Sequence, residues 1–100
     1  MKIIACDFDG TLFENRFPEI GPARTHLIER LLEEQRKGAK IILWSCREGD
    51  LLQAALDKCA EYGVRFDAVN ANLPETPEWM GYDSRKVFAT EYWDDRSFFD

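Results

Sequence analysis

Apolar and polar positions alternate along the chain in blocks whose spacing predicts strands and helices in turn. Residues 2–8 form a short apolar run, and residues 40–44 repeat it, which is typical of strands buried on both faces. Shorter β-rich stretches at 66–70 and 87–93 predict a third and a fourth strand. Polar residues follow each run, so the four strands are expected to end in polar turns.

Two stretches between these runs carry apolar residues at helical spacing. One extends from Pro22 to Gly38 and the other from Leu51 to Gly63, with proline and glycine at the positions where helices commonly begin and end. Residues 71–85 hold two prolines and a glycine, so we expect a loop there with room for one helical turn.

Strands that alternate with helices predict right-handed crossovers and a parallel sheet. The expected fold class is α/β, a three-layer Rossmann-like fold. The pattern alone allows several windings. If the chain runs outward from strand one and then returns to its other side, the order is 3-2-1-4, and ligands bind where strands one and four separate. A chain of 100 residues supports one hydrophobic core, so residues 1–100 are expected to form a single domain.

The chain has 19 acidic and 13 basic residues, a formal net charge of −6. This charge disfavours non-specific binding to nucleic acid or to an anionic membrane, and no membrane-spanning segment is visible. Cys6, Cys46 and Cys59 show no metal-binding spacing. They are expected to be reduced thiols of a cytoplasmic protein, with Cys6 and Cys59 in the core.

Acidic residues follow the first and the fourth strands, which the order 3-2-1-4 places side by side. These are Asp7, Asp9, Asp94 and Asp95. An Asp-x-Asp-Gly-Thr stretch taken alone is more typical of a polar turn. Several carboxylates in one crevice, however, repel each other unless a hard cation is bound, and oxygen ligands suit Mg²⁺. The combined pattern predicts a magnesium site.

The stretch Asp-Phe-Asp-Gly-Thr at 7–11 resembles the first motif of the haloacid dehalogenase-like superfamily, and Ser45 after the second strand resembles the second motif. Lys86 resembles the third motif and the Asp-Asp pair at 94–95 the fourth. With residues 44–48, the chain looks like small capless hydrolases of this superfamily and, more loosely, like polynucleotide 3′-phosphatase domains.

The resemblance implies a phosphomonoester hydrolase that depends on Mg²⁺. Asp7 would attack phosphorus and form an aspartyl-phosphate, while Asp9 would act as general acid and then as general base. Lys86 and the metal would neutralise charge, and the Ser45 hydroxyl would orient the phosphoryl oxygens. The metal ligands would be the Asp7 carboxylate, the Asp9 backbone carbonyl, and Asp94 or Asp95.

Substrate contacts are expected from the backbone N–H groups of Gly10 and Thr11, and from Cys46 and Arg47, which follow Ser45. For Arg47 a surface ion pair is an equal alternative.

Two assignments stay open. Because Lys86 lies only eight residues before Asp94, Arg85 or no residue at all is the alternative for the third motif. The alternation of strand side chains does not decide between Asp94 and Asp95 as the direct ligand.

The intervals in which the superfamily inserts cap domains are short here. Residues 12–21 number ten and residues 71–85 number fifteen, too few for a separate core, so we expect an open site with no cap domain. Both helices are expected on one face of the sheet. Because an uncovered parallel sheet is unusual, we also expect a homo-oligomer.

The natural substrate is open between a phosphorylated small molecule and a nucleic-acid end. A polynucleotide 3′-end phosphatase is suggested by Ser-Cys-Arg-Glu at 45–48 and opposed by the net acidity. A catalytically silent receiver-like binding module would gather similar groups. Receivers, however, place the acceptor later in the chain and lack an Asp two residues after it.

Overall fold

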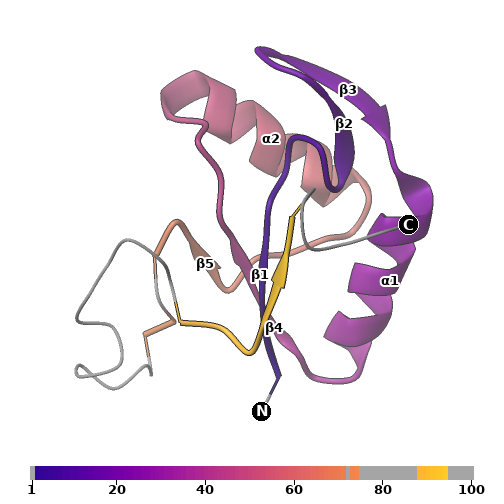
Figure 1. Cartoon of the computed structure of the whole chain (residues 1–100), viewed down its shortest axis with the longest axis vertical. Helices are drawn as coiled ribbons and strands as arrows, with labels where there is room; N and C mark the ends of the chain where they lie inside the picture. The colour runs from indigo at the N-terminus through magenta and orange to yellow at the C-terminus, as the bar shows by residue number, and fades with distance from the viewer. Residues whose placement is uncertain (1, 72, 75–87, 95–100) are drawn as a thin grey trace.

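A computed structural model describes residues 2–71, 73–74 and 88–94, which have an α/β fold around a four-stranded parallel sheet. Figure 1 shows this sheet at the centre of the molecule. Its strands, in spatial order, are β5 (Ala68–Val69), β4 (Lys40–Leu43), β1 (Ile3–Cys6) and β6 (Glu91–Trp93).

The sequence pattern predicted four strands in the order 3-2-1-4. The described residues form six strands, and the parallel sheet among them has the order 5-4-1-6 in chain numbering. The two further strands, β2 (Phe13–Arg16) and β3 (Glu19–Ala23), form an antiparallel hairpin. Helix α1 (Thr25–Arg36) begins after this hairpin, so the helix start expected at Pro22 is wrong. Pro22 lies in β3, because a proline, which lacks an N–H group, is also accepted in edge strands.

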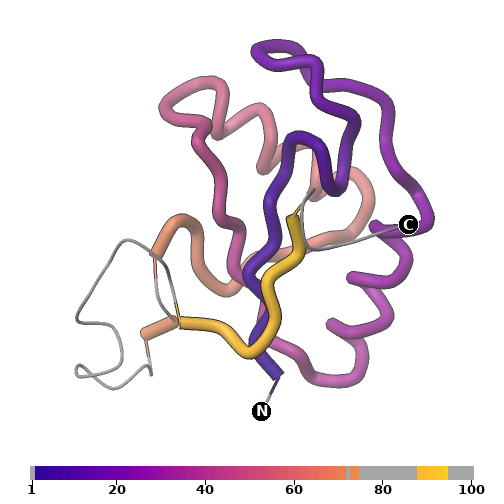
Figure 2. Tube along the Cα trace, in the orientation of Figure 1, coloured from indigo at the N-terminus to yellow at the C-terminus, as the bar shows by residue number. Residues whose placement is uncertain are grey.

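Both described helices, α1 and α2 (Gly49–Glu61), pack on the same face of the sheet. The tube in Figure 2 traces them alongside the strands. Strand residues alternate between faces, so every second residue of β1 and β4 faces this core. The core includes Ile4, Cys6, Ile41 and Leu43 from the sheet, Ile28 and Leu31 from α1, and Ala55 and Cys59 from α2. Neither described helix is long and apolar enough to cross a membrane.

The second face of the sheet is also buried. Ile3, Ala5 and Ile42 are 8%, 3% and 0% exposed, and they form a second apolar cluster with Leu73. The expectation of an uncovered face is therefore wrong, and oligomerisation, which rested on it, stays a prediction without that support. Of the three layers predicted, the described residues show the sheet and the helices on one of its faces.

The strands β1, β4 and β6 end at the same level. Cys6 is paired with Leu43 on one side and with Trp93 on the other, so the residues that follow these strands meet at the carboxyl edge of the sheet. The hairpin β2–β3 lies beyond this edge (Figure 1). Its two strands approach so closely at Gly21 that a Cβ atom there would lie 2.2 Å from the carbonyl oxygen of Glu14. Glycine, which has no Cβ atom, allows this approach.

Candidate active site

A cleft of about 330 Å³ opens at the carboxyl edge of the sheet. It is lined by Asp7, Asp9, Asn15, Phe17 and Cys46. The sequence pattern predicted three of these residues and missed Asn15 and Phe17, because no strand was predicted in the segment that carries them. A larger hollow of about 610 Å³ lies on α1 and contains none of the predicted site residues.

The position of Asp7 is determined by the two strands that meet beside it. Its backbone N–H donates to the carbonyl of Trp93 at 2.9 Å, and its Oδ1 accepts from the N–H of Phe8 at 2.8 Å. Because Cys6 and Trp93 are paired, Asp94, the residue directly after β6, comes level with Asp7.

Within the described ranges, no three His, Cys, Asp or Glu side chains gather closely enough to hold a metal ion. Asp95, one of the predicted ligands, lies outside those ranges. Asp7 and Asp9 contribute only oxygen donors to the cleft, and this chemistry fits a hard cation such as Mg²⁺.

Asp9 forms a two-point ion pair with Arg47. The guanidinium Nε donates to Oδ2 and Nη2 donates to Oδ1, both at 2.8 Å. The Arg47 side chain is 1% exposed and that of Asp9 15% exposed. The hydrogen bonds to Asp9 raise the pKa of Arg47 and outweigh the opposing effect of burial. Arg47 therefore directs its charge at Asp9 from inside the protein.

The same guanidinium holds the hairpin in place. It donates to the carbonyls of Pro18 at 3.2 Å and Glu19 at 2.9 Å, and makes a longer contact of 3.5 Å with the carbonyl of Leu51 in α2. The ring of Phe8 lies 5.0 Å from its Cζ atom, and the ring of Phe17 lies 5.2 Å away. The alternative of a surface ion pair for Arg47 is wrong in its location, because Arg47 pairs with Asp9 from a buried position. The substrate contact expected of Arg47 stays a prediction.

Ser45 takes part in two hydrogen bonds that fix the loop after β4. Its Oγ accepts from the N–H of Arg47 at 3.1 Å, and its own N–H donates to the Asn70 side chain at 2.7 Å. Asn70 has a positive φ of 52° and follows β5. Asn70, at the end of β5, thus orients Ser45, the predicted second motif, at the end of the neighbouring strand β4.

The turn at residues 10–12 differs from its expected role. The N–H groups of Gly10 and Thr11, expected to orient phosphoryl oxygens, donate within the turn to the carbonyls of Phe13 at 2.8 Å and Phe8 at 3.3 Å. The Thr11 side chain is 1% exposed, and its Oγ1 has no hydrogen-bond partner among the described residues.

Arg24, which sequence reasoning did not single out, holds this turn against α1. Its guanidinium donates to the carbonyl of Gly10 at 2.9 Å, and its N–H donates to the carbonyl of Leu12 at 2.8 Å. Only the three-dimensional contact reveals this role, because Arg24 lies 14 residues from Gly10.

The thiols are placed as the sequence predicted for Cys6 and Cys59, which are buried in the core. Burial, aided by the charge of Asp7, raises the pKa of Cys6 well above its ordinary value, and burial raises that of Cys59 to about 12. Cys46 is exposed at the cleft. Lys86 and Arg85, the candidates for the third motif, lie outside the described residues.

No protein-family model and no curated protein matches the chain significantly. The chain is similar to a solved structure described as that of a conserved protein coded by a locus from Bacteroides thetaiotaomicron, with a TM-score of 0.82. Because the two are 42% identical over 95% of this chain and 76% of that one, the chain belongs to the same family as this conserved Bacteroides protein.

Proposed function

We propose that this protein is a magnesium-dependent phosphomonoester hydrolase of the haloacid dehalogenase-like superfamily and that Asp7 is its nucleophile. The observation that carries the proposal is the cleft. Asp7 and Asp9 line it together at the carboxyl edge of the parallel sheet, where open α/β sheets bind their ligands.

In the proposed reaction, a carboxylate oxygen of Asp7 attacks phosphorus while the bond from phosphorus to the leaving oxygen breaks. The N–H of Phe8, which donates to Asp7 Oδ1, limits the directions in which this carboxylate points. Asp9 gives a proton to the leaving oxygen. It then takes a proton from the water that attacks the aspartyl-phosphate and frees Asp7.

Arg47 positions Asp9 for both steps of this scheme. Its guanidinium donates to both oxygens of the Asp9 carboxyl group, and such a two-point contact fixes the direction in which the group faces. In the scheme Asp9 enters the first step protonated, and the carboxylate left after that step acts as the base in the second.

The oxygen donors of the site are compatible with Mg²⁺, which would neutralise negative charge on the phosphoryl group. We propose the Asp7 carboxylate and the Asp9 backbone carbonyl as ligands. Of the two acidic residues after β6, the register favours Asp94, because it follows Trp93, the partner of Cys6.

The test is phosphate release from p-nitrophenyl phosphate with and without Mg²⁺. We expect magnesium-dependent turnover by the wild-type protein and none by Asp7→Asn, with the fold of the variant checked by circular dichroism. Asp57→Asn is the matched control, because Asp57 is an exposed carboxylate of α2. If Asp7→Asn keeps most of the activity, Asp7 is not the nucleophile; if the wild-type protein releases no phosphate, the proposed function is wrong.

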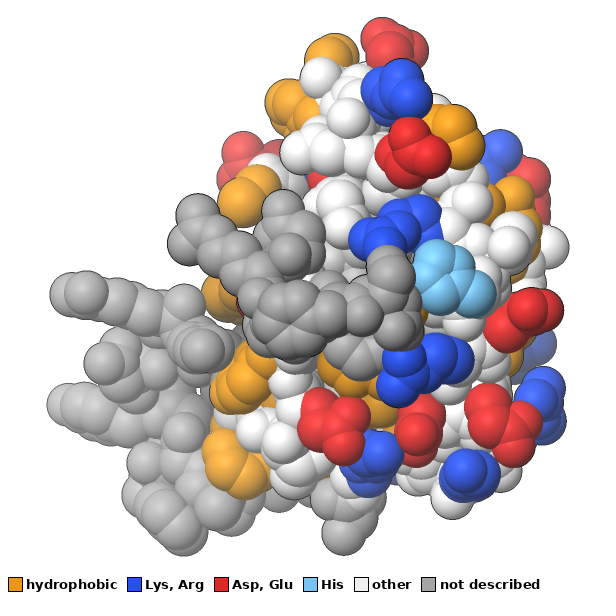
Figure 3. Space-filling view, turned by 45° about the vertical axis from the view of Figure 1, so that its right-hand side comes forward, with side chains coloured by type: hydrophobic (Ala, Val, Ile, Leu, Met, Phe, Trp, Pro, Cys, Tyr) orange, Lys and Arg blue, Asp and Glu red, His pale blue; other side chains and the backbone are white. Residues whose placement is uncertain are grey.

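The assay also separates the two alternatives. A receiver-like module would become stably phosphorylated without turnover. A polynucleotide 3′-end phosphatase would prefer 3′-phosphorylated oligonucleotides. The second alternative fits poorly with the net charge of −6 and with the face shown in Figure 3, where the Lys and Arg side chains of the described residues are interspersed with Asp and Glu.

A further inference from the structure

Phe17 is an aromatic side chain that the fold leaves at the cleft without burying it. It lies in the turn between β2 and β3, is 54% exposed, and lines the cleft with Asp7 and Asp9. Residues of the sheet and helices bury the other large apolar side chains of this region, Phe8 and Phe13, which are 0% and 1% exposed. More than half of Phe17 therefore stays exposed to solvent, in contrast to these two buried rings.

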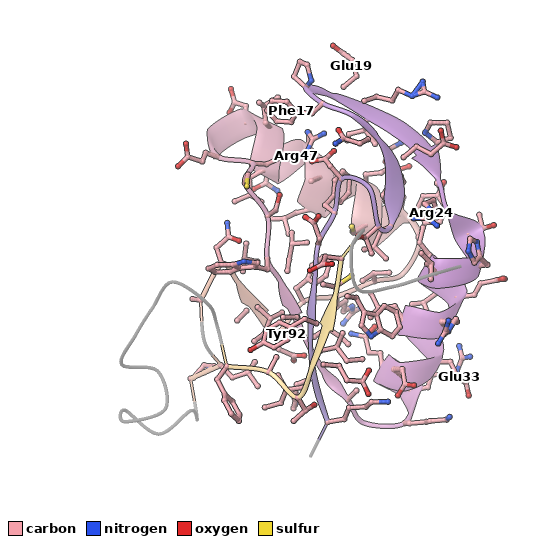
Figure 4. The ribbon with its side chains drawn as sticks, in the orientation of Figure 1. Phe17, Glu19, Arg24, Glu33, Arg47 and Tyr92 are labelled. Carbon is pink, nitrogen blue, oxygen red and sulfur yellow. The ribbon has the colours of Figure 1, made fainter. Side chains whose placement is uncertain are left out.

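The position of the Phe17 ring is nevertheless well determined. The ring lies 5.2 Å from the Arg47 guanidinium, which is itself held by Asp9 and by the carbonyl of Glu19. The N–H of Phe17 donates to the side chain of Asn15 at 3.2 Å. Figure 4 shows Phe17 and Arg47 next to each other where the hairpin approaches α2. The ring is thus supported by a buried cation and presents its remaining surface to solvent.

We propose that Phe17 is a binding surface for a planar ring in the substrate, and that the substrate class is small phosphomonoesters that carry a nucleobase-sized ring, such as nucleoside monophosphates. This inference rests on the proposed phosphatase function. A phosphate group alone needs no aromatic wall, and a cleft of about 330 Å³ has room for more than a phosphate. A nucleobase that stacks on an aromatic side chain binds more tightly, because every base has a π-face. The net charge of −6 disfavours long polyanions, which selects a single nucleotide.

The test compares adenosine 5′-monophosphate with ribose 5-phosphate. Both release phosphate from a primary alcohol oxygen, so they differ mainly in the presence of the base. We expect kcat/KM to be about tenfold higher for the nucleotide, which is within the range that stacking on one aromatic side chain provides. Phe17→Leu should bring this ratio close to one, and Phe17→Trp should keep it. Tyr62→Leu, which removes a 40% exposed aromatic residue outside the cleft, should leave the ratio unchanged.

A second measurement separates this inference from the proposed function. Calorimetric binding of the same two compounds to Asp7→Asn, with and without Phe17→Leu, needs no turnover. If the wild-type protein hydrolyses neither compound but the nucleotide binds more tightly in a Phe17-dependent way, the phosphatase proposal fails and the binding surface stands. If the two compounds are hydrolysed equally well, or if Phe17→Leu leaves their ratio unchanged, the inference is overturned. It is also overturned if Phe17→Leu changes only the oligomeric state in sedimentation, because the ring then serves contacts between copies.

Discussion

Asp9 and Arg47, 38 residues apart in the chain, form an ion pair in which both oxygens of the carboxylate accept a hydrogen bond of 2.8 Å. The pair joins the end of β1 to the loop after β4, and Arg47 extends it to the hairpin through the carbonyls of Pro18 and Glu19. One buried side chain therefore fixes a proposed catalytic residue and one wall of the cleft.

We expect Arg47→Ala to lower the free energy of unfolding by about 3–5 kcal/mol, because it leaves the Asp9 carboxylate without its buried partner. Urea denaturation measures the change. The free energy of unfolding of Arg47→Lys should lie between those of wild type and Arg47→Ala, because lysine keeps the charge but lacks the planar guanidinium. The matched control is Arg16→Ala, whose ion pair with Glu14 is more than half exposed on both sides and should contribute less than about 1 kcal/mol. Equal losses for the Arg47 and Arg16 variants would show that the buried pair adds no stability.

Thr11→Val should raise the free energy of unfolding by about 1 kcal/mol, because valine has the same shape and removes a buried hydroxyl that has no partner among the described residues. Thermal and urea denaturation both measure this. Thr90→Val is the contrasting variant, because the Thr90 hydroxyl accepts from the N–H of Ile3 at 2.8 Å and donates to its carbonyl at 2.9 Å. That change should destabilise the protein. A loss of stability in Thr11→Val would contradict the first expectation.

The lowered pKa of Glu91 leads us to expect that the free energy of unfolding depends on pH. Partial burial acts to raise its pKa, but hydrogen bonds from Trp93 and Lys2 and the charge of Lys2 outweigh it, so the pKa is lowered. A carboxyl group whose pKa is lower in the folded state stabilises the fold above the ordinary glutamate value of about 4.3, and this stabilisation disappears as the pH falls through the folded-state value. Glu91→Gln should therefore be less stable than wild type at neutral pH.

The difference between wild type and Glu91→Gln should shrink as the pH is lowered in a series of urea denaturation curves. Glu61→Gln controls for the loss of any one carboxylate, because Glu61 belongs to an exposed pair with Lys58 on α2. A difference that stays constant down to the lowest pH would contradict the assignment to Glu91.

Local pattern in the sequence predicted the parts of the fold that are buried and regular. The strands β1 and β4 are apolar runs whose residues are almost all buried, and such runs are visible without any partner. The same runs predicted that Asp7 and Asp9 stand at a strand end. Both residues line the cleft in the structure.

Only the tertiary structure decided the hairpin and the partner of Asp9. After its first residue β2 is exposed, and β3 has no buried residue, so neither strand carries the alternating apolar pattern that identifies a strand in a sequence. The hairpin is held instead by hydrogen bonds from Arg47, which lies 29 residues after Pro18 and 28 residues after Glu19 in the chain. Periodicity records which residues of one segment share a face, whereas an ion pair between distant segments depends on how the whole sheet brings their ends together.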